Sequence, residues 1–208
     1  MIKGKNFVGR LRIKKIRGFT LIELLVVLAI VAVLALVSIL VLNPTELLRQ
    51  ARDSRRISDM STLKTAVSLY ISDVTSPSLG TNMRCYGSMG PTSSAACAVA
   101  NGGPFRAGDI GSYGSSTINN KSVTGDGWLP IAFNSMSAGA PFGSLPVDPV
   151  NDANNFYMYL ATSSPGITFK ITAQMESAKY SSSGPNDVES TDGGLTTKWF
   201  ESGTDLNL

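Results

Sequence analysis

The feature of this sequence that most restricts its fold is a run of 19 residues, 24–42, that contains no charged side chain and a single polar one, Ser38. As an α-helix, such a run rises roughly 28 Å, about the hydrocarbon thickness of a bilayer. The run therefore predicts a membrane-spanning helix. Residues 19–22 extend the apolar segment, so Glu23 lies inside it. A carboxylate there costs on the order of 2.5–3.5 kcal/mol on insertion scales, and we expect a specific partner to offset that cost.

The charges of the chain are divided unevenly. Residues 1–18 hold seven of the 18 basic side chains and none of the 15 acidic ones, so the whole chain has a formal charge of +3 and the rest of it −4. Seven positive charges before an apolar segment predict a cytoplasmic N-terminus, with the remainder across the membrane. The segment is longer than the core of a secretory signal, and no A-x-A-like site follows it, so we expect it to be retained. An uncut signal anchor that carries a binding or enzymatic domain is the alternative.

A second helical pattern follows the apolar run. Asn43-Pro44 should bend or interrupt the helix, because proline lacks a backbone donor. Beyond it, apolar residues recur at 3-4-3-4 spacing and form one stripe: Met60, Leu63, Val67, Tyr70 and Val74. Between Asn43 and this stripe lie charged residues, which we expect on the opposite face of the helix, toward water or neighbouring molecules. They are Arg52, Asp53, Arg55, Arg56 and Asp59. We expect a membrane helix over residues 19–42 and its amphipathic continuation over 43–74.

The remainder of the chain has the composition of loops and strands. Residues 75–127 are rich in glycine and serine and predict a long loop region, in which short strands can occur. Strand-like segments follow at residues 128–133, 156–161 and 167–175, and the turn sequence of residues 163–166 predicts a hairpin between the last two. Residues 196–200 could add another strand. The sequence thus predicts an α+β fold, in which a small antiparallel β-sheet within residues 128–208 packs on the amphipathic half of the long N-terminal helix.

Two cysteines, Cys85 and Cys97, fall in the part expected outside the cytoplasm, where disulfides persist. The residues between them are small and flexible, which permits closure, so we expect a disulfide; two separate free thiols are the alternative. The chain has no histidine, which excludes a Ser-His-Asp triad and a Cys-His pair. No phosphate-binding glycine loop and no set of zinc ligands is recognisable. We therefore expect no catalytic residues and no enzymatic activity.

The segment Gly18-Phe19-Thr20-Leu21-Ile22-Glu23-Leu24-Leu25-Val26-Val27 closely resembles the N-terminal signature of type IV pilins and type II secretion pseudopilins. The resemblance covers about a tenth of the chain, and the helix that follows, with Ala51-Arg52-Asp53-Ser54-Arg55-Arg56, also looks like this family. It implies that a membrane aspartyl protease, the prepilin peptidase, cuts between Gly18 and Phe19 on the cytoplasmic side. The same enzyme would then N-methylate Phe19.

This cut would give Glu23 its partner. Removing residues 1–18 removes the charges that hold the N-terminus in the cytoplasm, and it creates an α-ammonium group on Phe19. When helices stack with a vertical offset, that ammonium can approach the Glu23 carboxylate of a neighbour. The pair is favourable in a low-dielectric bundle, where either charge alone is costly. Glu23 would thus set register and drive assembly; a Glu near the head groups of a plain anchor is the alternative.

Two further segments bear on the kind of subunit. Leu145-Pro146-Val147-Asp148-Pro149 resembles the Leu-Pro-x-Asp-Pro segment of the major secretion pseudopilins, and an ordinary rigid turn is the alternative. That group is also known for a calcium site near the C-terminus. Candidate ligands here are Asp187, Glu189 and Asp192, with Asp205 downstream, and a solvated acidic loop is the alternative. The length of residues 77–127 departs from compact pseudopilins, and the cysteine pair suits disulfide-looped pilins better.

The resemblance predicts a structural subunit of a type II secretion-like pseudopilus that supports protein secretion. It would insert in the bacterial inner membrane, contact lipid, and assemble through residues 19–72 with copies of itself and related pilin-like subunits on an inner-membrane assembly platform. The alternative is a major or minor type IV pilin that serves adhesion, motility or DNA uptake. The charge of −4 after residue 18 does not favour nucleic-acid binding.

Overall fold

The computed structural model describes residues 18–89, 97–98, 102–106, 108, 110, 112–113 and 120–208. The chain divides into two compact units, Met1–Asn43 and Pro44–Leu208, and each is described by itself. The predicted basic leader, apart from Gly18, lies outside the described residues.

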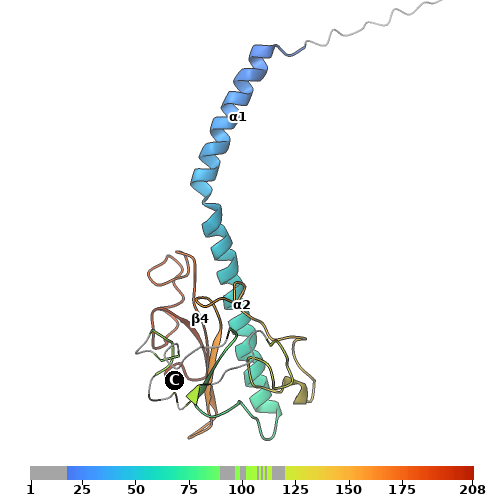
Figure 1. Ribbon diagram of the computed structural model, residues 1–208, viewed down its shortest axis with the longest axis vertical. Coiled ribbons are helices and arrows are strands. Elements are labelled where there is room, and N and C mark those ends of the chain that lie inside the picture. Colours follow the sequence, from blue (N-terminus) through green and yellow to red (C-terminus); the bar gives the residue numbers. More distant parts are fainter. Residues whose placement is uncertain are drawn as a thin grey trace, which may run out of the picture. The chain divides into compact units, whose positions relative to one another are not determined.

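The described part of the first unit is helix α1 (Leu21–Leu42), drawn in blue in Figure 1. Thr20 caps its N-terminus, and it ends at Asn43, which adopts the left-handed conformation with φ 38°. Within α1, the stretch Leu21–Ile39 has a mean hydropathy of 3.0 and no buried residue, and it is long and apolar enough to cross a membrane. The helix expected over residues 19–42 is present but begins two residues later, at Leu21.

The second unit begins with helix α2 (Pro44–Asp73), also labelled in Figure 1. Pro44 occupies the first helical position, where its missing N–H leaves no hydrogen bond unmade. The apolar stripe of α2 is buried, as its spacing predicted: Met60, Leu63, Ala66, Val67 and Tyr70. The interruption expected at Asn43-Pro44 is present, and the amphipathic helix ends one residue before the predicted boundary.

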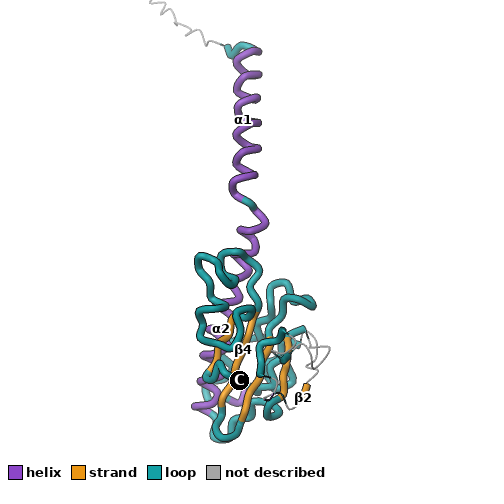
Figure 2. The backbone as a smooth tube through the Cα atoms, turned by 90° about the vertical axis from the view of Figure 1, so that its left-hand side faces the viewer, coloured by secondary structure: helices purple, strands orange, loops and turns teal. Residues whose placement is uncertain are grey.

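Five strands form one sheet in the second unit, drawn in orange in Figure 2. They are β1 (Arg84–Gly87), β2 (Ser112–Tyr113), β3 (Met158–Thr162), β4 (Thr168–Ala173) and β5 (Phe200–Gly203). Their order is β2-β1-β3-β4-β5; the pairs β1–β3, β3–β4 and β4–β5 are antiparallel, and only the short β2 pairs in parallel with β1. The predicted α+β fold, a long N-terminal helix with a small antiparallel sheet, is confirmed.

The sheet is covered on both faces, so every residue of β3 is buried. Alternate side chains point to opposite faces. Tyr159 and Ala161 join the core that contains the stripe of α2, whereas Met158 and Leu160 join a second core. That second core adds Cys85 of β1 and Phe156, which precedes β3, to residues from the long segment after β1 and from the C-terminal region: Cys97, Ala98, Phe105, Ile110, Trp199 and Leu208.

The predicted hairpin is confirmed as β3 and β4, but other strand predictions were wrong. Residues 128–133 form no strand: only an isolated bridge joins Ala132 to Thr124, and a short 3-10 helix, η4 (Phe133–Ser135), follows. Pro130 supplies no N–H, and the amides of Ile131 and Phe133 bond to carbonyls two residues back. The strand expected at residues 196–200 begins only at Phe200, and the sheet draws β1 and β2 from the region expected to be mainly loop.

Candidate processing and assembly site

The expected cut site precedes helix α1. Gly18, Phe19 and Thr20 are not helical, and α1 begins at Leu21. Thr20 is extended, with φ −81° and ψ 150°. Phe19 is 75% exposed, and a Cβ added to Gly18 would meet no atom within 4 Å. The peptide bond between Gly18 and Phe19 therefore lies in an exposed, non-helical segment.

Thr20 and Glu23 form a capping box at the start of α1. The Thr20 hydroxyl accepts a hydrogen bond from the Glu23 N–H at 3.3 Å, and the Glu23 carboxylate accepts one from the Thr20 N–H at 3.5 Å. The spacing Thr-x-x-Glu is the signature of this arrangement, so the sequence contained a signal for Thr20 that our sequence reasoning missed. The Thr20 hydroxyl also donates to the Glu23 carboxylate at 3.4 Å, and both contacts of the carboxylate are long enough to be exchanged for a stronger partner.

The apolar surface of α1 is exposed all around the helix. Each of its leucine, isoleucine and valine side chains between Leu21 and Ile39 is between 46% and 83% exposed. Such a surface is stable in lipid or against other apolar helices, and costs free energy in water. Glu23 stands within this surface, three residues after the N-cap.

A buried charge cluster centred on Arg56 joins α2 to two loops. The Arg56 guanidinium donates through Nε and Nη2 to both carboxylate oxygens of Asp148, at 2.6 and 2.8 Å, and through Nη1 to Asp53 at 2.7 Å. Nη1 also lies 3.2 Å from the Glu176 carboxylate. Burial alone would lower the pKa of Arg56, but the hydrogen bond and charge of Asp148 raise it. We expected Asp53 and Arg56 on the solvent face, and this was wrong: both are fully buried.

The segment Leu145-Pro146-Val147-Asp148-Pro149 supplies one side of the Arg56 cluster. Leu145 is buried in the core, and the Pro146 carbonyl accepts a hydrogen bond from Trp128 Nε1–H at 2.9 Å. Asp148 Oδ1 also accepts from the amides of Val150 and Asn151, at 2.8 and 3.2 Å. The turn is therefore held both by hydrogen bonds within it and by the contact of Asp148 with Arg56 of α2.

The other side of the cluster is the loop after β4. Asp53 accepts from the amides of Glu176 and Ser177, and Arg52 Nε donates to the Glu176 carboxylate at 2.6 Å. About one helical turn after Arg56, Asp59 of α2 accepts a hydrogen bond from the Tyr157 hydroxyl at 2.8 Å. The first half of α2 is thus bound by ionic and hydrogen-bonding groups, and its second half by the apolar stripe.

Each of the three candidate calcium ligands accepts hydrogen bonds from its own set of backbone amides. Asp187 accepts from Ser183, Glu189 and Ser190, and Asp192 accepts from Gly194 and Glu201. Glu189 is buried and accepts from Met175 and Ser182; burial raises its pKa to about 7. Within the part of the chain that the structure describes, no group of three or more His, Cys, Asp or Glu side chains is arranged to hold a metal ion.

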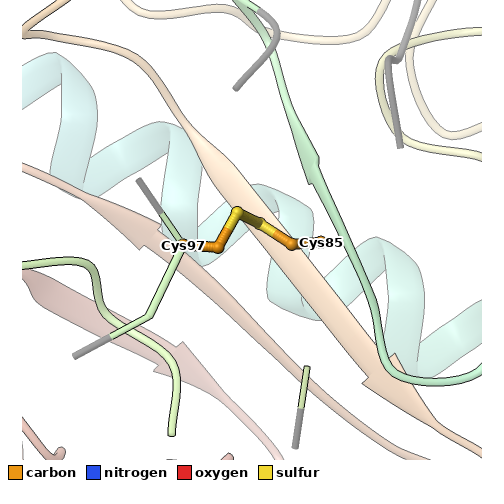
Figure 3. The surroundings of a disulfide bond; sticks show 2 residues. All are labelled: Cys85 and Cys97. Carbon is orange, nitrogen blue, oxygen red and sulfur yellow. A yellow bond between two sulfur atoms is a disulfide. The ribbon is translucent and has the colours of Figure 1, made fainter. Parts of the chain in front are cut away.

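Cys85 and Cys97 form a disulfide in the structure (Figure 3), with their Cα atoms 6.4 Å apart. Cys85 lies on β1, and both cysteines are fully buried in the second core. Next to the bridge, Ala98 pairs with Phe105. The disulfide therefore ties the segment after β1 to the sheet face that α2 leaves uncovered.

Comparison with known proteins adds one finding to this geometry. A family model described as the prokaryotic N-terminal methylation motif matches residues 13–39. No curated protein and no solved structure matches the chain. The matched residues include the expected cut site, Thr20, Glu23 and most of α1.

The matched motif indicates a structural subunit, and the apolar helix α1 fits an anchor in the inner membrane. More narrowly, the chain carries the N-terminal motif of type IV pilins and pseudopilins, so the resemblance stated from its residues is confirmed at the level of this family. The motif implies processing by the prepilin peptidase and assembly into multimers.

Proposed function

We propose that the chain is the precursor of a type II secretion-like pseudopilus subunit, cut between Gly18 and Phe19 and assembled through α1. The observation that carries this proposal is the coincidence, within residues 13–39, of the methylation motif with an exposed apolar helix that contains Glu23. A membrane anchor needs the apolar helix and gains from Glu23 only its part in the capping box. A filament subunit uses both.

The chemistry of the N-terminus supports this function. Cutting after Gly18 frees α1 from the basic leader and creates an ammonium on Phe19, which becomes N-methylated and keeps its charge. At 4 Å, opposite unit charges attract by roughly 4 kcal/mol at an effective dielectric constant of 20. This attraction is comparable to the cost of a carboxylate at the centre of a membrane helix, on the order of 2.5–3.5 kcal/mol, which is an upper bound for Glu23 in the first turn of α1. Pairing with a neighbour's ammonium therefore offsets that cost and favours the assembled state.

The second unit would then be displayed on the filament by α2. The contact between Asp148 and Arg56 supports a pseudopilus, because it gives the aspartate of the Leu-Pro-x-Asp-Pro segment a task in binding the helix. Partners in this function are other copies of the chain, related pilin-like subunits and the inner-membrane assembly platform. The work is mechanical, and secreted proteins are moved by growth of the filament.

A type IV pilin is the second candidate, and the disulfide favours it. Cys85 and Cys97 fasten the segment after β1 to the sheet face that α2 leaves uncovered, an arrangement suited to a displayed surface for adhesion, motility or DNA uptake. Deleting the gene separates the two functions: loss of protein secretion with surface fibres intact supports the pseudopilus, and the reverse supports the pilus.

Mass spectrometry of the full-length protein extracted from membranes tests the filament function itself. The expected result is loss of residues 1–18 and one methyl group on the amine of Phe19. A chain that retains Met1 in cells with an active prepilin peptidase would overturn the proposal in favour of an uncut anchor. A variant with Gly18→Leu serves as the uncut reference, because the added side chain changes only the residue before the cut.

A further inference from the structure

The boundary between the expected cut site and helix α1 is set by Thr20. Backbone groups inside a helix bond to each other, whereas those of an extended segment are free to bond to an enzyme. Gly18 and Phe19 belong to such a segment, and helical hydrogen bonding begins when the Leu24 N–H reaches the Thr20 carbonyl, at 3.2 Å. The scissile bond thus ends two residues before the helix begins.

The Thr20 hydroxyl stabilises the helix end at Leu21, because it supplies an acceptor for an N–H group that would otherwise be unsatisfied. The first four N–H groups of a helix have no helical acceptor, and in hydrocarbon each unsatisfied group costs several kcal/mol. Thr20 Oγ1 accepts the N–H of Glu23 at 3.3 Å. Without this oxygen, the same N–H finds an acceptor when the helix grows by one residue, because the Phe19 carbonyl stands four residues before it. Such growth makes Phe19 the new N-cap, so the carbonyl that follows the scissile bond is taken up by the helix, and each further residue of growth brings the bond itself closer to helix.

We propose that Thr20 is a positioning residue for cleavage, because its cap holds the peptide bond between Gly18 and Phe19 in the extended form that the peptidase takes. The inference rests on the proposed function, in which this bond is cut. The methylation motif, which spans residues 13–39, independently places an enzyme's action at this end of α1. Within the capping box the tasks are then divided: Thr20 presents the bond for cutting, and Glu23 pairs during assembly.

Capping and direct recognition by the peptidase make opposite predictions for substitutions. Thr20→Val keeps the shape of the side chain and removes the acceptor, whereas Thr20→Ser and Thr20→Asn change the shape and keep one. Losing a cap shifts the equilibrium toward the longer helix by about fivefold. We therefore expect Thr20→Val to be cut up to about fivefold more slowly, and both capping variants to be cut at the wild-type rate. A peptidase pocket shaped for threonine would instead accept valine and reject asparagine.

The test is the initial cleavage rate of the full-length chain in membranes with prepilin peptidase, normalised to the inserted precursor. Ser38→Ala is the matched control, since it also removes a hydroxyl from α1. The Ser38 hydroxyl donates to the Leu34 carbonyl at 2.8 Å and caps no N–H at the helix end. Slow cleavage of Thr20→Val alone supports the inference. Equal cleavage of Thr20→Val and wild type, or equal slowing of all three Thr20 variants, overturns it. If the wild type itself is not cut, the proposed function fails instead.

Discussion

Arg56 and Arg55 are neighbouring arginines on α2 that test the buried charge cluster against a matched surface contact. Replacing each by methionine keeps the length of the side chain and removes the guanidinium. Arg56→Met leaves Asp148 without the bidentate partner that it contacts at 2.6 and 2.8 Å. Arg55→Met removes one contact, in which Nε lies 3.8 Å from Asp59.

The two substitutions should differ greatly in their effect on stability. The side chains of Arg56 and Asp148 are both 0% exposed, and removing one partner of a buried pair costs roughly 3–5 kcal/mol. Asp148 and Asp53, the two fully buried partners of Arg56, each keep two amide donors, so we expect the lower end, about 3 kcal/mol. The Arg55 side chain is 69% exposed, and such surface pairs along a helix contribute about 0.3–0.5 kcal/mol.

Urea unfolding of the full-length chain in detergent, followed by tryptophan fluorescence, measures this difference. Trp128 is fully buried and donates to the Pro146 carbonyl, two residues before Asp148, so its emission reports on this turn. The midpoint should fall for Arg56→Met and stay near wild type for Arg55→Met. Similar dependence on urea in all variants shows that the change is one of stability.

A double variant makes the reasoning refutable even if Arg56→Met is poorly folded. Arg56→Met with Asp148→Leu removes both charges of the pair, and replacing a buried pair by apolar residues is often neutral. We expect it to be more stable than Arg56→Met alone. Equal losses for Arg55→Met and Arg56→Met, or additive losses in the double variant, would refute the role assigned to the cluster.

Three further predictions concern other sites. Glu23→Ala should be inserted and cut normally, because the N-cap hydroxyl remains, but should assemble poorly; wild-type filament yield in a sedimentation assay would contradict pairing with the Phe19 ammonium. Replacing Cys85 and Cys97 by serine removes a bridge over a separation of 12 residues, and should lower the free energy of unfolding by roughly 3 kcal/mol in the same urea assay. Dithiothreitol should cause the same loss in the wild type, and an unchanged midpoint would exclude a stabilising bridge. Burial raises the pKa of Glu189 from 4.5 to about 7, so between these values the folded protein keeps a proton that the unfolded chain has released. Stability should therefore fall as pH rises through that window, and Glu189→Gln should flatten the slope; a slope unchanged by the substitution would show that other groups produce it.

Local patterns predicted those elements whose cause is local. The uncharged run and the leader charges located α1, the 3-4 spacing located α2, and the turn at residues 163–166 located the β3–β4 hairpin. Residues 128–133 show the limit of such patterns. Their apolar side chains are buried as expected, with Trp128 and Phe133 fully so, but burial does not require a strand. Which backbone groups pair is decided by residues far along the chain, and Pro130 removes a donor that pairing would need.

The error over Asp53 and Arg56 has a different cause. Apart from Ala66, the buried positions of α2 run 53, 56, 60, 63, 67 and 70, which is one unbroken 3-4 series. Our sequence reasoning began the stripe at Met60 because the residues before it are charged. Helical spacing places residues on a face whatever their chemistry, and the position of Arg56 on the buried face was therefore predictable. Its partners were not, since Asp148 and Glu176 lie 92 and 120 residues further along the chain.

The contacts of Asp148 also bear on the choice between a pseudopilin segment and an ordinary rigid turn. A rigid turn needs its two prolines, which restrict the backbone, and it can end in any residue that tolerates them. Here Asp148 is buried and accepts hydrogen bonds from Nε and Nη2 of Arg56. The same carboxylate also accepts from the amides of Val150 and Asn151. A turn that only reversed the chain would gain nothing from burying a charge. Because this charge is matched by Arg56, the segment fastens its own turn to α2 within the second unit.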